Sequence, residues 1–124
     1  MKKTINIAQL PDDMQVLIWE MVETSQSTEI LNRLKNHRFR VSCIPLNAFP
    51  DIAIGTDYRN EEYARSMMYT NLPPIIVCGS QLLDGRHRVW VSKAMGAAEI
   101  PAIDLAEIGF VYNFPPLCTI EQYR

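Results

Sequence analysis

The feature that most constrains the fold is a run of local signals between residues 75 and 105. A short apolar segment, Ile75–Cys78, precedes the tight-turn pair Gly79-Ser80, and the chain returns through residues 81–83 to Asp84-Gly85. Helical periodicity follows over residues 86–95, and Gly96 is placed where helices commonly end. Residues 100–105 are predicted to form another strand, at a sheet edge because of Pro101. This order predicts a small sheet with a helix packed on it.

The junction between the second strand and the helix, residues 84–88, contains the residues most suited to binding an anion. A helix that starts directly after a strand leaves backbone N–H groups unpaired at its N-terminus, which favours anion binding. Gly85 permits close approach of a phosphate, and Arg86, His87 and Arg88 add charged donors. On these residues alone, a structural interpretation is equally favoured, in which Asp84 caps the helix and Arg88 pairs with a surface carboxylate.

The first third of the chain is predicted to be helical. Pro11-Asp12-Asp13 favours a helix start, and Ser27 is placed to cap a second helix from about residue 28 to 36. Trp19 falls off the apolar stripe of the first helix and is expected to be buried or to meet a partner. That stripe consists of Met14, Leu17, Ile18, Met21 and Val22.

The middle of the chain is predicted to contain a strand, a loop and a helix. Alternation places Phe39, Val41 and Cys43 on one face of a half-buried strand. Turn formers fill residues 47–59, and residues 60–70 have helical character, with Tyr63, Ala64, Met67 and Met68 on the apolar face. In the later helix, Val89, Trp90 and Ala94 are expected to face the sheet.

Composition narrows the class of protein. The 124 residues carry a net charge of −2 and no long apolar run, so a single cytoplasmic domain without a membrane span is expected, and tight binding to duplex DNA is not. The basic segment 36–40 is interpreted as a solvated helix end and strand start. Cys43, Cys78 and Cys118 lack zinc-site spacing and are predicted to be buried thiols.

Residues 39–106 resemble the ParB/sulfiredoxin-like domains. The likeness rests on the hairpin, on Asp84-Gly85-Arg86-His87-Arg88, on the helix ending at Gly96 and on the strand Ile100–Ile103, with Val41–Leu46 similar to the family's first strand. The resemblance implies an α/β (α+β) fold with a small mixed sheet and flanking helices. Residues 1–37 would form an N-terminal helical extension, residues 38–106 the core, and residues 107–124 an aromatic C-terminal tail.

The resemblance also implies a nucleotide-phosphate site. Its binding residues would be Gly85, Arg86, His87, Arg88 and Arg59, and its ligand ATP or CTP with Mg²⁺. Asp84 and His87 would be catalytic in phosphoryl transfer or nucleotide hydrolysis, with Asp84 as base or metal contact. A second carboxylate is expected among Asp51, Asp57 and Glu61, and the spacing does not choose between them.

Two departures from the family separate its branches. Arg86 occupies the position of the sulfiredoxin cysteine, which argues against sulfinic acid reduction, and no helix-turn-helix follows the core, which argues against chromosome partition. Two alternatives to an enzyme of phosphoryl chemistry stay open. One is a binding module that contacts a protein through Trp19, Phe110, Tyr112 and Phe114, and the other is a small ParB-like nuclease or DNA-linked regulator. The acceptor substrate and oligomeric state are undetermined.

Overall fold

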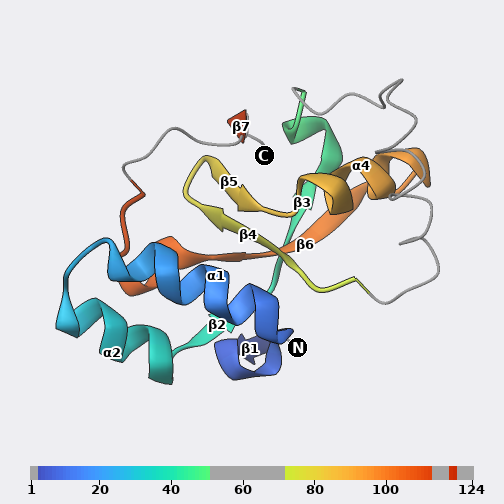
Figure 1. The fold of residues 1–124 in the computed structure, drawn as a ribbon. Coiled ribbons are helices and arrows are strands. Elements are labelled where there is room, and N and C mark those ends of the chain that lie inside the picture. Colours follow the sequence, from blue (N-terminus) through green and yellow to red (C-terminus); the bar gives the residue numbers. More distant parts are fainter. Residues whose placement is uncertain (1–2, 51–71, 113–117, 120–124) are drawn as a thin grey trace.

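The computed structural model describes residues 3–50, 72–112 and 118–119, which form a mixed α+β fold with two sheets (Figure 1). The smaller sheet pairs β1 (Thr4–Asn6) antiparallel with β2 (Arg38–Arg40). The larger sheet has the order β3-β6-β4-β5-β7, in which β6 and β4 are parallel and the other pairs antiparallel. Its strands are β3 (Ser42–Pro45), β4 (Ile75–Cys78), β5 (Gln81–Asp84), β6 (Glu99–Asp104) and β7 (Cys118–Thr119).

Three α-helices within the described residues match the sequence signals. In α1 (Asp12–Glu23) the first turn is acidic, and in α2 (Thr28–Asn36) the Ser27 side chain accepts a hydrogen bond from the Ile30 N–H at 3.2 Å. The helix α4 (Arg86–Ala94) is followed by Gly96 at φ +75°, as predicted. Single turns of 3₁₀ helix occur at Ile7–Gln9 (η1), Leu46–Ala48 (η2) and Leu105–Ile108 (η3).

Buried side chains form two cores, and β4 contributes to both because its side chains alternate between the faces of the sheet. The helix-side core, beneath α1 and α2, contains Ile7, Leu10, Met14, Ile18, Val22, Leu34, Phe39, Ile76, Cys78, Leu83, Ile103, Leu105, Ile108 and Phe110. The α4-side core contains Ile44, Leu46, Ala48, Phe49, Ile75, Val77, Leu82, Val89, Ile100 and Ala102. The N-terminal helices therefore pack on the same core as β4 and β6, and the arrangement has three layers (Figure 1).

The sequence predicts one strand over residues 39–43 with Phe39, Val41 and Cys43 on its buried face, and this prediction is wrong for Cys43. The chain changes sheets at Val41, whose N–H donates to the Lys3 carbonyl at 3.0 Å, so β2 and β3 are separate strands. This change resets the alternation. Phe39 is buried in β2, but in β3 the buried residue is Ile44 and Cys43 is exposed. The prediction of a buried Cys43 thiol is wrong for the same reason, whereas that of Cys78 is confirmed.

Two details of the later elements also differ from expectation. β6 lies between β3 and β4 rather than at an edge, because Pro101 precedes the pairing with β4, which starts at Ala102, and its missing N–H costs no bond there. Ala94 is exposed, like the residues up to 99 that follow it, because the last turn of α4 projects beyond the sheet. Val89 is buried and Trp90 is half-buried, as expected. Val91, which was not predicted to face the sheet, is also buried.

The predicted helix over residues 60–70 lies outside the described residues, as do Cys118's side chain and Phe114. Within the part of the chain that the structure describes, no helix has the length and apolar character needed to cross a membrane.

Gly85 is a position where the fold requires glycine. It lies at φ +117°, and a Cβ there would approach Ile75 Cγ2 to 2.5 Å. We expect Gly85→Ala to lower the free energy of unfolding by about 2–4 kcal/mol, measured by urea denaturation, because strain and overpacking add. Gly96→Ala is the matched control, since φ is +75° but the space is open, and it should cost about 1 kcal/mol. Equal losses at the two positions would contradict the packing argument.

Candidate functional site

The candidate site is the turn from Asp84 to Arg88, where β5 passes into α4. A register shift in the β4–β5 pairing leaves Leu83 unpaired, directly before Asp84. Gly85 is the N-cap of α4, and the first helical bond runs from the Val89 N–H to the Gly85 carbonyl at 3.0 Å. Among the described residues no side chain caps the helix, and Asp84 binds Arg88, so the structural alternative in which Asp84 caps the helix is wrong. The N–H groups of residues 86–88 precede that first bond and have no acceptor within the helix.

Asp84 binds Arg88 instead. Arg88 Nη2 donates to Asp84 Oδ2 at 3.0 Å, and the two side chains are 9% and 30% exposed. The pair spans one turn of the helix and is charge-assisted. The alternative in which Arg88 pairs with a carboxylate is therefore confirmed, although the pair is largely buried rather than on the surface.

Arg88 also links two layers of the fold. Its Nη1 lies 3.5 Å from Met14 Sδ on α1, and the guanidinium packs behind Gly85, whose missing Cβ would lie 3.0 Å from Nη2. Among the described residues, Arg88 Nε is buried without a hydrogen-bond partner. The contact with Met14 carries no sequence signal beyond the apolar stripe of α1.

The other basic residues of the turn are accessible. Arg86 is exposed and His87 is half-exposed, so both reach solvent at the start of α4. Arg88 is directed toward Asp84 and Met14 and is 8% exposed, which assigns it to the support of the turn rather than to its surface. Arg59 and the three candidate carboxylates Asp51, Asp57 and Glu61 lie outside the described residues.

No family model, curated protein or solved structure matches this chain. The resemblance to ParB/sulfiredoxin-like domains therefore stays a prediction drawn from the sequence. The predicted order of a hairpin, a helix and a strand is present as β4, β5, α4 and β6, and β6 runs parallel to β4.

Cys43 and Cys78 are not activated nucleophiles. Burial raises the pKa of the Cys78 thiol, and nearby Asp104 adds to the effect. Partial desolvation and the charge of Glu99 raise the pKa of the Cys43 thiol as well. Since nucleophilic cysteines require a lowered pKa, neither residue supports a thiol mechanism.

The aromatic residues proposed for partner binding are partly committed to the core. Phe110 is 2% exposed and belongs to the helix-side core, while Trp19 and Tyr112 pack against that core with partial exposure. Phe110 is therefore removed from any contact surface. The large exposed apolar side chains among the described residues are Val16, Met95 and Val111, which lie on three separate segments.

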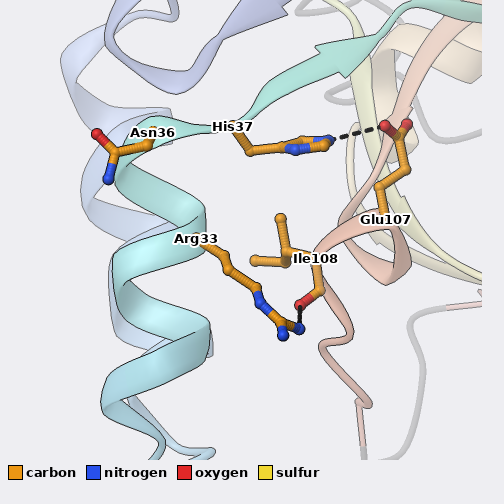
Figure 2. Close-up of a pocket in the computed structure, with 5 residues that line it drawn as sticks. All are labelled: Arg33, Asn36, His37, Glu107 and Ile108. Carbon is orange, nitrogen blue, oxygen red and sulfur yellow. Dashed lines mark hydrogen bonds and ion pairs between the residues drawn. The ribbon is translucent and has the colours of Figure 1, made fainter.

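A cavity of about 340 Å³ lies between α2 and η3, lined by Arg33, Asn36, His37, Glu107 and Ile108. Figure 2 shows two polar bridges across it. His37 Nε2 lies 3.0 Å from Glu107 Oε1, and Arg33 Nη1 donates to the Ile108 carbonyl at 3.3 Å. Because each of its polar side chains already has a hydrogen-bond partner, this cavity acts as a joint between α2 and the sheet, and we assign it no ligand.

Within the described ranges, no group of three or more histidine, cysteine, aspartate or glutamate side chains is placed to hold a metal ion.

The Asp84–Arg88 pair makes a thermodynamic prediction. Asp84→Ala should lower the free energy of unfolding by about 2 kcal/mol, because it leaves a buried guanidinium without its counter-charge. Replacing both residues, as Asp84→Ala with Arg88→Met, should recover stability to within about 1 kcal/mol of the wild type. Urea unfolding of the single and double variants measures this coupling. Additive losses would show that the pair makes no mutual contribution.

Proposed function

We propose that the Asp84–Arg88 turn binds the phosphates of a nucleoside triphosphate or diphosphate, ATP or CTP, and that the protein uses this site for phosphoryl transfer or nucleotide hydrolysis. The observation that carries the proposal is a helix N-terminus with a glycine at its N-cap and a basic first turn. Gly85 brings the backbone into the left-handed conformation there, and the N–H groups of residues 86–88, which have no acceptor within the helix, follow it.

The charge pattern of α4 supports an anionic ligand. Its first turn has no acidic residue, whereas α1 has Asp12 and Asp13 and α2 has Glu29 in that position. Each cation at the positive end of a helix dipole costs roughly 0.3–1 kcal/mol, and a bound anion would reverse the sign of that interaction. Exposed Arg86 and half-exposed His87 are placed beside the same N–H groups.

The remaining residues of the turn have separate roles in this proposal. Arg88, held by Asp84 Oδ2, fixes the turn from behind and is a positioning residue. The second oxygen of Asp84 has no partner among the described residues and is the candidate to orient an attacking hydroxyl or water. Mg²⁺ would be held by the nucleotide phosphates together with this carboxylate and would neutralise phosphate charge.

Isothermal titration calorimetry with ATP, ADP, CTP and GTP in the presence of Mg²⁺ tests the binding claim. We expect Arg86→Ala to weaken nucleotide binding roughly 10–100-fold, the value of a lost charge-assisted hydrogen bond. Arg33→Ala removes an arginine of the same charge from the distant α2–η3 joint and should leave the affinity unchanged. Wild-type protein that binds none of the nucleotides would refute the proposal.

Phosphate release from the nucleotide tests the catalytic claim separately. Asp84→Asn should abolish turnover while nucleotide binding is kept, because the amide retains an oxygen for Arg88 but is no base. A nucleotide that binds without turnover in the wild type would reduce the protein to a nucleotide-binding module. Circular dichroism of each variant controls for folding.

A further inference from the structure

A cationic cluster lies at the end of α2 and in β2, outside the Asp84–Arg88 turn. Figure 1 shows β1 and β2 well separated from α4. The segment from 33 to 40 holds several basic side chains within eight positions. They are Arg33, Lys35, His37, Arg38 and Arg40.

The fold divides this cluster into two groups. Arg33 forms an ion pair with Glu29. His37 is hydrogen-bonded to Glu107 (Figure 2), so both side chains of the first group have an acidic partner. Lys35, Arg38 and Arg40 are exposed, and in the part of the chain that the structure describes none of their side chains has an acidic partner, while the backbone N–H of Arg40 donates to Glu107 Oε1 at 3.4 Å. The second group therefore presents three cationic side chains without acidic partners on a chain whose net charge is −2.

The register of the small sheet places two of these cations, Arg38 and Arg40, together. Arg38 and Arg40 are two residues apart on β2, so their side chains emerge on one face, opposite the face that carries buried Phe39. Their cross-strand partners on β1 are Asn6 and Thr4. Asn6 Nδ2 also donates to the carbonyls of Lys35 and His37, at 3.3 and 3.2 Å, and so fixes the end of α2 beside the strands.

One of the arginines is already ordered on this face. Arg38 Nε donates to Thr4 Oγ1 at 3.0 Å, and Nη2 donates to the Thr4 carbonyl at 3.2 Å. Its Nη1 has no partner within the described residues. The Arg38 side chain is therefore already ordered, so ligand binding would lose less conformational entropy at this residue.

We propose that this ribbon face, formed by Thr4, Asn6, Lys35, Arg38 and Arg40, binds the phosphodiester backbone of a single-stranded nucleic acid. Arginine fits phosphate geometry, and neutral hydrogen-bonding groups separate the charges. None of the exposed large apolar residues of the described chain lies on β1, β2 or α2, which argues against membrane insertion or a protein interface. Three cations, Lys35, Arg38 and Arg40, are too few for tight duplex binding.

The proposal predicts weak, sequence-independent and salt-dependent binding. For contacts by these residues to a single strand, the slope of log K against log salt should be about −2, so affinity should fall roughly 100-fold between about 20 and 200 mM salt. Arg38→Gln with Arg40→Gln should reduce that fall to roughly fivefold. The face carries no aromatic side chain among its residues, so oligo-dT and mixed sequences should bind alike.

Fluorescence anisotropy of labelled single-stranded DNA and RNA oligonucleotides, with duplex DNA and anionic vesicles as further arms, tests this claim on the full chain. Arg40→Gln is the clean variant because, among the described residues, no hydrogen bond or ion pair to its side chain is present and its backbone bond to Glu107 is kept. Arg33→Gln is its control, because it makes the same charge change at a side chain that is paired with Glu29. We expect weaker binding for Arg40→Gln only.

Equal losses for the two variants, no binding at low salt, or a preference for vesicles would overturn the proposal. Loss on Arg86→Ala instead would place the oligonucleotide at the α4 turn and would also overturn it. The proposal does not depend on nucleotide binding by that turn, since calorimetry with mononucleotides and anisotropy with oligonucleotides use different variants.

Discussion

The contacts of the buried Arg88 guanidinium hold the turn between β5 and α4 and connect it to α1. The guanidinium joins α4 to α1 through Met14, holds Asp84 at the end of β5, and lies against Gly85. A charge that is only 8% exposed is stable because its counter-charge lies one helical turn away. Gly85 must lack a side chain because Ile75 and Arg88 occupy the space. The conformation of the turn is thus set by the packing of Ile75 and Arg88 against Gly85.

The sequence was sufficient where local chemistry decides structure. Ser27 identified the start of α2, Gly79-Ser80 the β4–β5 hairpin, with Gly79 at φ +60°, and Gly96 the end of α4. Sequence reasoning failed where distant segments decide. The change of sheet at Val41 depends on pairing with Lys3, and the interior position of Pro101 depends on where β4 begins. No local pattern contains those partners.

The same distinction applies to the candidate site. The residues of the turn and its helix N-terminus were predictable, because strand, glycine and helix are adjacent in the chain. The different orientations of its basic side chains were not predictable. Arg86, His87 and Arg88 look equivalent in sequence, but helical geometry directs Arg88 inward to Asp84 and Met14 and leaves Arg86 in solvent. The basic residues between 33 and 40 differ in the same way. Glu29 pairs with Arg33 and Glu107 with His37. Among the described residues, the side chains of Lys35, Arg38 and Arg40 have no acidic partner.

Phosphate binding at the N-terminus of α4 is tested most directly by a ¹H–¹⁵N correlation spectrum of the labelled protein, titrated with Mg²⁺ and a nucleoside triphosphate. We expect the amide signals of Arg86, His87 and Arg88 to move first and to saturate together, because their N–H groups have no acceptor within the helix. Signals that move only around Arg33 and Glu107, or that do not move at all, would contradict it.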